Sequence, residues 1–316
     1  MMLSRVADSL YWMSRYFERA EHTARLMAVM LEAMVEQSRE ETSLAWRRVG
    51  VALSAEELLP DMPDPQLTTD KLAFDRNNPS SLFSSLAFAR DNARQVREQL
   101  STEVWQYLNG LYLRLSPVTA EAIWKGQPAR LFREALEDFY TLNGVTYSTL
   151  SHSEGWYFLE IGRYIERAQL IIRLLDLHFG EARRLIAGEP SHLDWIVLLK
   201  YCTAFEPYCK TYTAIIDPDR IAEFLLFDAE FPHSVRYAVD RVCDALASVA
   251  PGAPPRRRAA VERLAGRLKA AIDFTQIDEL KGAGLSPFLA NITEACEDIH
   301  EAVYASYIAY GAETVL

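Results

Sequence analysis

Two segments of this chain carry the residue types that are best suited to polar chemistry. Arg15-Tyr16-Phe17-Glu18-Arg19-Ala20-Glu21 is followed in the second half by Arg163-Tyr164-Ile165-Glu166-Arg167-Ala168-Gln169. Packing alone would preserve only hydrophobicity, but these segments also share two arginines, a tyrosine and a glutamate. Because a guanidinium forms paired hydrogen bonds to a carboxylate or a phosphate, the repetition predicts a shared polar site. Its candidate residues are Arg15, Tyr16, Glu18, Arg19, Arg163, Tyr164, Glu166 and Arg167.

The two residues of each Glu-Arg pair should point in different directions. A helix turns by about 100° per residue, so Glu18 and Arg19 would lie on different flanks of one helix. One arrangement is reciprocal, with Glu18 meeting Arg167 and Glu166 meeting Arg19. Such contacts could serve only to fix the register of two central helices. Alternatively, further arginines on these helices could face a cleft and hold a carboxylate or phosphate. These further arginines are Arg15, Arg25, Arg163 and Arg173.

A second polar group lies before and within a predicted helix of the first half. In the segment Asn77-Asn78-Pro79-Ser80-Ser81, Asn78 is expected to be the N-cap, with the proline in the first turn. The free N–H groups of such a helix start attract anions. Arginine and asparagine then recur in the string Ala89 to Arg94. These residues either cap the helix and stay solvated or contact an anion or a partner. The candidates from this region are Asn77, Asn78, Ser81, Arg90, Asn92 and Arg94.

Standard catalytic signatures are absent from the sequence, which has no GxxxxGK[ST], HExxH or GxSxG motif. Glu297-Asp298-Ile299-His300 is one ExxH motif on a predicted helix, but a di-iron bundle needs a second. The other two matches, at 189–192 and 230–233, contain prolines at helix breaks. We therefore predict no metal site and no cofactor, and whether the chain catalyses a reaction stays open.

Long amphipathic patterns position these polar residues. Apolar residues from Val6 to Met34 recur at alternating steps of four and three, and the same seam returns from Phe158 to Phe179. Other echoes keep their order along the chain, since Leu44-Ala45-Trp46 returns as Leu193-Asp194-Trp195. Alternating β-branched runs, which would indicate strands, are scarce. The pattern is typical of an all-α protein.

The echoes predict that the fold is a duplication. We expect one domain over 1–316 built from two repeats, about 1–150 and 151–316, each a roughly four-helix unit. A pseudo-twofold axis would relate the repeats, which would share a core through the two Glu-Arg helices. No Gly/Ser-rich linker lies near residue 150, so separable halves are not expected.

Composition and charge exclude several partners. The chain has 316 residues, 50% of them hydrophobic, and 44 acidic against 33 basic residues give a net charge of -11. Nucleic acid or an anionic membrane surface would require a positive face, so neither is expected as a partner. No run approaches the roughly 18 uncharged apolar residues that span a bilayer. We expect a soluble, cytoplasmic protein.

Several motifs together resemble the bacterial alpha-E proteins. They are the two Glu-Arg helices, Asn78-Pro79-Ser80-Ser81, Ala89-Arg90-Asp91-Asn92-Ala93-Arg94, and Glu154-Gly155-Trp156 ahead of the second Glu-Arg pair. The resemblance covers nearly the whole chain, although the second copy lacks the double asparagine and the arginine-rich string. What it implies is a context: such proteins are typically encoded beside, or fused to, circularly permuted ATP-grasp ligases and transglutaminase-like peptidases.

Two classes of function are therefore open. In the first, the chain is an accessory helical protein that acts with an ATP-grasp-type ligase in peptide or amide-bond synthesis or modification, with a transglutaminase-like protein as a further partner. In the second, it is an enzyme or binder in its own right, which holds an amino acid, peptide or phosphate ligand in the Glu-Arg cleft. Buried, mutually satisfied pairs would favour the first, and a pocket with unpaired donors would favour the second.

Overall fold

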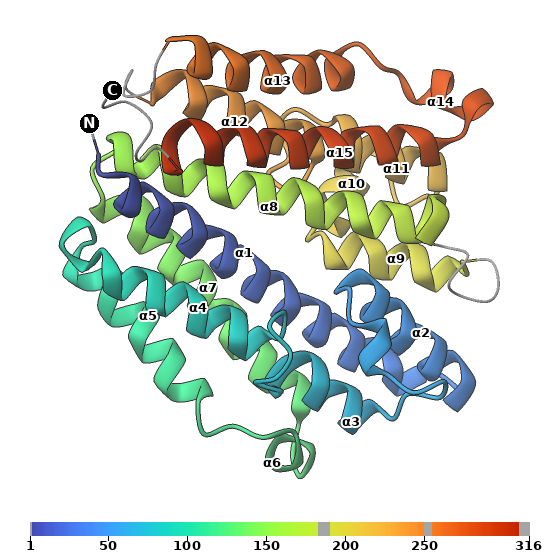
Figure 1. The fold of residues 1–316 in the computed structure, drawn as a ribbon. Coiled ribbons are helices and arrows are strands. Elements are labelled where there is room, and N and C mark those ends of the chain that lie inside the picture. The colour runs from blue at the N-terminus through green and yellow to red at the C-terminus, as the bar shows by residue number, and fades with distance from the viewer. Residues whose placement is uncertain (1, 183–189, 250–254, 310–316) are drawn as a thin grey trace.

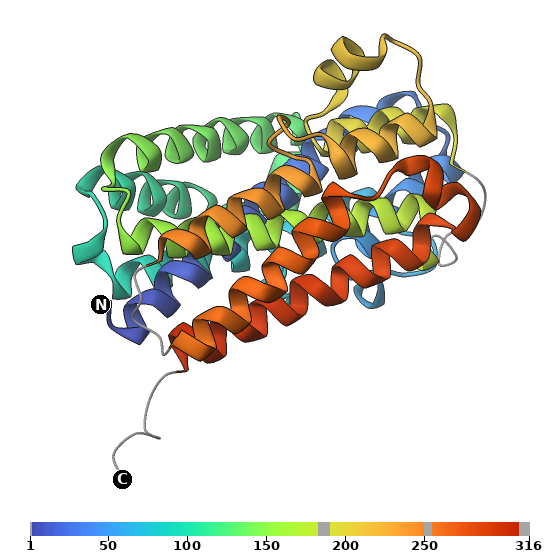
Figure 2. The ribbon, with the colours of Figure 1, turned by 90° about the horizontal axis from the view of Figure 1, so that it is seen from above.

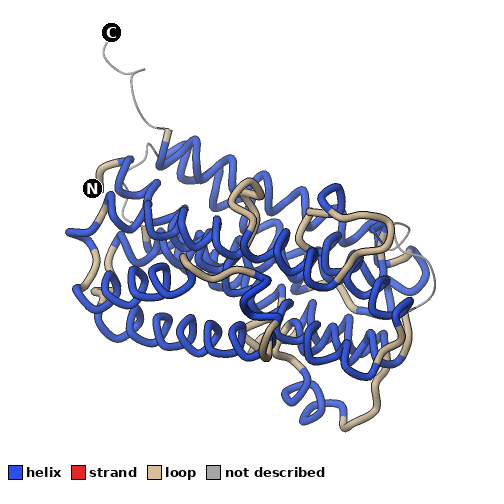
Figure 3. The backbone as a smooth tube through the Cα atoms, turned by 90° about the horizontal axis from the view of Figure 1, so that it is seen from below, coloured by secondary structure: helices blue, strands red, loops and turns tan. Residues whose placement is uncertain are grey.

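The computed structural model describes residues 2–182, 190–249 and 255–309. Within these ranges the chain forms helices, turns and loops and contains no strand, which confirms the all-α prediction (Figure 3). The described residues contain 15 α-helices, several of them short, so a four-helix repeat was too simple a prediction. None of these helices combines the length and the apolar character that crossing a bilayer requires.

The described residues of the first half form seven α-helices, of which α1 is the longest (Figure 1). They are α1 (Ser4–Ala33), α2 (Arg39–Ala52), α3 (Pro65–Thr69), α4 (Leu82–Gln95), α5 (Thr102–Leu115), α6 (Ala120–Trp124) and α7 (Pro128–Thr149). The second half follows with α8 (Glu154–Phe179), α9 (His192–Tyr201), α10 (Phe205–Tyr212), α11 (Pro218–Phe227), α12 (Val235–Ser248), α13 (Pro255–Asp273), α14 (Ile277–Ala283) and α15 (Leu285–Val303).

The two Glu-Arg helices, α1 and α8, pack against each other at the centre of the molecule. Helices α4 and α7 cover α1, whereas α12 and α15 cover α8, as Figures 1 and 2 show from two directions. Each half also contributes one helix that contacts the central helix of the other half, because α2 contacts α8 and α9 contacts α1. Buried residues of both halves join in one hydrophobic core. This arrangement is what two repeats sharing a core would give, while the duplication and its axis stay predictions.

A glycine allows α1 and α8 to approach closely. Gly162 is the tightest point, because a Cβ atom there would lie 2.3 Å from both the Ser14 Oγ and the Tyr11 carbonyl oxygen. The carbonyl belongs to the backbone and cannot move aside as a flexible side chain would. A larger residue at position 162 would therefore push the two central helices apart.

The start of α4 differs from the sequence prediction. Its N-cap is Ser81, whose Oγ accepts a hydrogen bond of 3.1 Å from the Ser84 N–H. The Asn78 side chain is already engaged in the preceding turn, where Oδ1 accepts from the Ser80 N–H and Nδ2 donates to the Lys71 carbonyl. Pro79 therefore lies in that turn rather than in the first turn of the helix, and the prediction for Asn78 was wrong.

Candidate functional site

One Glu-Arg contact between α1 and α8 is closed and buried. The Arg167 guanidinium donates to both oxygens of Glu18, with Nε–Oε1 of 2.6 Å and Nη2–Oε2 of 2.8 Å. Glu18 is only 2% exposed and Arg167 7%. Burial opposes the charge of Arg167, but the adjacent Glu18 carboxylate outweighs this effect and raises the pKa of Arg167. Both oxygens of the carboxylate are paired with donors, and Arg167 keeps its charge.

The side chains around the Glu18–Arg167 pair fill the available space. Arg25 forms an ion pair with Glu21 one turn earlier on α1, and His22 and His233 complete the cluster. The space among these side chains has no room for a water molecule. Burial, together with neighbouring arginine charges, holds the pKa of both histidines well below the usual 6.5, so they are neutral near pH 7. This copy of the motif is a packed polar core.

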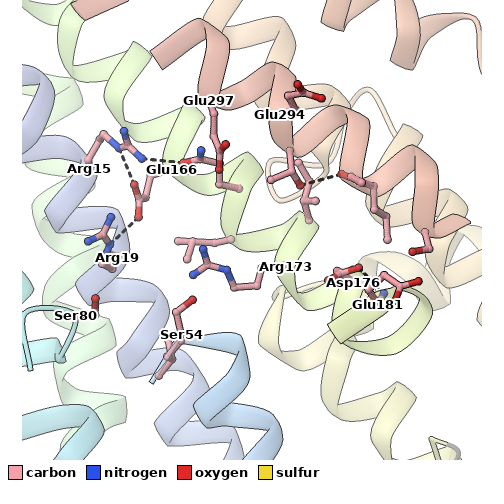
Figure 4. A pocket seen from close by; sticks show the side chains of 18 residues that line it. Arg15, Arg19, Ser54, Ser80, Glu166, Arg173, Asp176, Glu181, Glu294 and Glu297 are labelled. Carbon is pink, nitrogen blue, oxygen red and sulfur yellow. Dashed lines mark hydrogen bonds and ion pairs between the residues drawn. The ribbon is translucent and has the colours of Figure 1, made fainter. Parts of the chain in front are cut away.

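The reciprocal contact, on Glu166, is built differently. Arg15 Nε donates to Oε2 and Arg19 Nε donates to Oε1, each at 2.7 Å (Figure 4). Arg15 continues the network by donating to Gln169 Oε1 at 2.8 Å. Burial would raise the pKa of Glu166, but the two guanidinium groups outweigh it and hold that pKa below its ordinary value. Both contacts proposed from the sequence, Glu18 with Arg167 and Glu166 with Arg19, are therefore present in the structure.

A pocket of about 650 Å³ opens beside Glu166, between α1, α8 and α15. Its cationic wall consists of Arg15, Arg19 and Arg173, and Figure 4 shows Glu294 and Glu297 of α15 on another wall. The side chain of Arg19 is 25% exposed, against 7% for that of Arg15. Arg19 therefore borders the pocket, whereas Arg15 is buried.

Arg173 is the unusual group in this pocket. Its side chain is exposed, and it forms no hydrogen bond or ion pair with any residue that the structure describes. The pocket walls remove part of the water around Arg173, and this partial loss of hydration lowers its pKa. The nearby positive charge of Arg19 also lowers this pKa, whereas the Glu166 carboxylate raises it. A guanidinium remains protonated even when its pKa is somewhat lowered. The pocket therefore presents an uncompensated positive charge.

A single difference between the two sequence copies explains why Arg173 is free. On α1, Arg25 is paired with Glu21, which lies four residues earlier. The corresponding residue before Arg173 on α8 is Gln169, whose amide oxygen accepts instead from Arg15. Because an amide carries no charge, Gln169 cannot neutralise Arg173 as Glu21 neutralises Arg25. The change from Glu to Gln at the end of the echo was the sequence signal for this residue.

The remaining Glu-Arg motif residues take supporting positions. Tyr16 and Tyr164 each place a ring beside the arginine three residues later. The ring centre lies 5.6 Å from Arg19 Cζ in the first case and 5.1 Å from Arg167 Cζ in the second. Arg163 points elsewhere, because its Nη2 donates to Asn143 Oδ1 at 2.9 Å. Of the four arginines proposed to face a cleft, Arg15 and Arg173 therefore line the pocket, whereas Arg25 and Arg163 do not.

The second group of predicted residues does not reach the pocket. Arg90 donates to Asn109 at 2.7 Å and lies over the ring of Tyr112, so it joins α4 to α5. Asn92 donates to the Phe88 carbonyl, and Arg94 pairs with Asp91 on the helix surface. Asn77, Asn78 and Ser81 shape the turn before α4, and only their neighbour Ser80 lines the pocket. Pocket residues that the sequence analysis did not propose are Gln169, Ser54, Glu294 and Glu297.

In the described part of the chain, no group of three or more His, Cys, Asp or Glu residues is arranged to hold a metal ion. His300 of the ExxH motif is engaged with Tyr11, with 2.7 Å between its Nδ1 and the tyrosine Oη. Arg15 Nη1 donates to the same Oη at 3.3 Å, so Tyr11 connects His300 to Arg15. His300 thus supports Arg15 through Tyr11.

Comparison with known proteins identifies the chain by family. The model of the Alpha-E family, described as a predicted alpha-helical domain with a conserved ER motif, matches residues 2–308. Relatives include an uncharacterised protein of Mycobacterium bovis and two of Mycobacterium tuberculosis, each 26% identical over 94% of this chain. The chain spans about a third, 35%, of the length of these relatives. No solved structure matches.

Proposed function

We propose that this chain, which belongs to the Alpha-E family, binds a small ligand with a carboxylate or phosphate group in the pocket beside Arg173. The observation that carries the proposal is the unpaired guanidinium of Arg173 in a pocket of about 650 Å³. Within the described residues, Arg15 and Arg19 are occupied by Glu166, whereas Arg173 has no acceptor. An anion would supply one, in a geometry that arginine favours.

The closed copy of the motif supports this assignment by contrast. Around Glu18 and Arg167, every nearby cation has a carboxylate and no cavity remains. Such a cluster supports folding and register. The pocket beside Glu166 retains both volume and a free donor. We infer that one copy of the motif holds the central helices together and the other binds a ligand.

We further propose that the bound ligand is used together with a partner enzyme. In this role the chain is an accessory protein in the cytoplasm that acts with an ATP-grasp-type ligase, and with a transglutaminase-like protein, in peptide or amide-bond synthesis or modification. The relatives support the proposal, because the matched region is only 35% of their length and so occurs joined to other polypeptide. The pocket would present an amino acid or peptide to the ligase.

Calorimetric titration tests ligand binding. Inorganic phosphate and the tripeptide Ala-Ala-Ala, which has a free carboxylate, are titrated into the wild type, Arg173→Gln and a control, Arg130→Gln. Arg130 is an exposed residue of α7 that does not line the pocket. We expect at least one probe to bind the wild type and the control with equal affinity. Arg173→Gln should weaken the affinity for that probe by at least about tenfold. Binding that survives Arg173→Gln unchanged would contradict the proposal.

Light scattering after size exclusion tests the accessory role. The chain is mixed at micromolar concentration with an ATP-grasp-type protein from the same genome. We expect a complex whose mass equals the sum of the two chains. If the two elute separately, with and without the tripeptide, the accessory role is wrong, and ligand binding is then judged on the titration alone.

A further inference from the structure

The pocket beside Arg173 contains unpaired groups of both signs. Glu294 and Glu297 lie one turn apart on α15, are exposed, and form no ion pair with any described residue. Other carboxylates of the pocket are engaged, since Glu166 accepts from two arginines and Asp176 accepts from the Glu181 and Ala182 N–H groups. Figure 4 shows Glu294 and Glu297 across the pocket from Arg173.

From this arrangement we propose that the ligand is a zwitterion, an amino acid or short peptide whose carboxylate contacts Arg173 and whose ammonium group contacts Glu294 and Glu297. The inference rests on the proposed function and names the class of ligand. An ammonium group has three donors and matches two carboxylates on successive turns of one helix. A carboxylate matches the planar guanidinium. One ligand would thus contact all three unpaired groups, and its single positive charge would be shared between the two glutamates.

A phosphate compound fits the same pocket less well. A phosphate monoester carries a charge of about -1.5 to -2 near pH 7. It would form an ion pair with Arg173 but would also approach the two unpaired carboxylates on α15. Like charges at close range repel each other. A carboxylate carries a single charge, and the ammonium group of the same molecule cancels the repulsion. The acidic wall therefore selects against highly charged anions.

The rest of the pocket suits a side chain of modest size. Leu170, Ile172 and Leu289 contribute apolar surface, and Ser54 and Thr293 contribute hydroxyl groups. Ser54 adopts a φ of 51°, in the left-handed region that a residue with a Cβ seldom occupies. Ser54 follows the end of α2 and lines the same pocket as Arg173. A volume of about 650 Å³ accommodates a short peptide as well as a single amino acid.

The two charged ends of the ligand can be tested separately. Ala-Ala-Ala, its N-acetylated form and its C-terminal amide are titrated calorimetrically into the wild type and into Glu294→Gln/Glu297→Gln, with inorganic phosphate as a further probe. We expect N-acetylation to weaken binding to the wild type by at least about tenfold, equivalent to about 1.4 kcal/mol. In the double variant, acetylation should make no difference. Asp298→Asn, which removes an exposed charge of α15 outside the pocket, should behave as the wild type.

The outcomes separate this inference from the proposed function. If the free and N-acetylated peptides bind the wild type equally, and the amide binds weakly, the zwitterion is wrong while anion binding at Arg173 stands. Binding of phosphate without binding of any peptide likewise rules out the zwitterion and leaves anion binding in place. If neither phosphate nor any peptide binds, both the zwitterion and the proposed function are contradicted.

Discussion

Replacing Glu18 by Gln should destabilise the protein severely, because it leaves a buried charge without a partner. The variant preserves the size of the side chain but removes its charge. Glu18 accepts two hydrogen bonds from Arg167, at 2.6 and 2.8 Å, and the surrounding space has no room for water. An amide offers one acceptor oxygen and turns its NH₂ group toward the guanidinium. Arg167 cannot respond by losing its proton.

The expected magnitude follows from this burial. Breaking a buried ion pair by removing one partner costs about 3–5 kcal/mol, a large part of a total stability of about 5–15 kcal/mol. Glu166→Gln should cost less, about 1–3 kcal/mol, because Arg19 is 25% exposed and water or an anion in the pocket can replace the carboxylate. Both substitutions replace a glutamate by a glutamine. The difference between their costs in free energy of unfolding therefore measures the effect of a closed site compared with an open one.

Urea denaturation followed by far-ultraviolet circular dichroism measures both variants against the wild type. Glu18→Gln/Arg167→Met serves as a control, since removing both charges should recover part of the loss. We expect the order wild type, Glu166→Gln, Glu18→Gln in decreasing free energy of unfolding. A cost below about 1 kcal/mol for Glu18→Gln, the value typical of exposed pairs, would mean that burial does not make this ion pair indispensable.

Three further predictions address the pocket, the histidines and a helix cap. Gln169→Glu places a carboxylate one turn before Arg173, so it should neutralise that guanidinium. Calorimetry should then show that Ala-Ala-Ala binds about tenfold more weakly, or weaker still. The folded state keeps the pKa of His22 below 6.5, so the unfolded chain takes up more protons as the pH falls. Stability should therefore fall below about pH 6.5, and less steeply in His22→Leu, as urea titrations at several pH values will show. Ser81→Ala removes the N-cap of α4 and should cost about 1 kcal/mol, measured as a lower melting temperature.

Much of the helical core could be predicted from the sequence, because its physical basis is local and periodic. The heptad seam determined which face of α1 and α8 is apolar, and helical projection then placed Glu18 and Arg19 on separate flanks. With two such helices packed together, each glutamate has an arginine of the other helix within reach. The reciprocal contacts of Glu18 and Glu166 therefore followed from periodicity and charge.

The open pocket could not be predicted in the same way, because free volume depends on segments that are distant in sequence. His22 and His233 close one copy, and His233 comes from the turn before α12, which no periodic pattern places near α1. The N-cap of α4 was misplaced for a related reason. Both Asn78 and Ser81 can cap a helix, and only the tertiary contact of Asn78 with Lys71 decides between them.

The proposed division of labour between the two motif copies requires Arg173 to be free while its counterpart Arg25 is held in a closed cluster. Labelling of arginines with phenylglyoxal, read by peptide mass spectrometry on the folded protein, tests this contrast without knowledge of the ligand. The nitrogens of a neutral guanidine attack the carbonyl carbons of the reagent, and the pKa is lowered at Arg173 but raised at Arg25. We predict that Arg173 is modified early, that Arg25 and Arg167 stay unmodified until the protein unfolds, and that a bound tripeptide protects Arg173. Equal labelling of Arg173 and Arg25, or no labelling of Arg173, would contradict the contrast between an open and a closed copy.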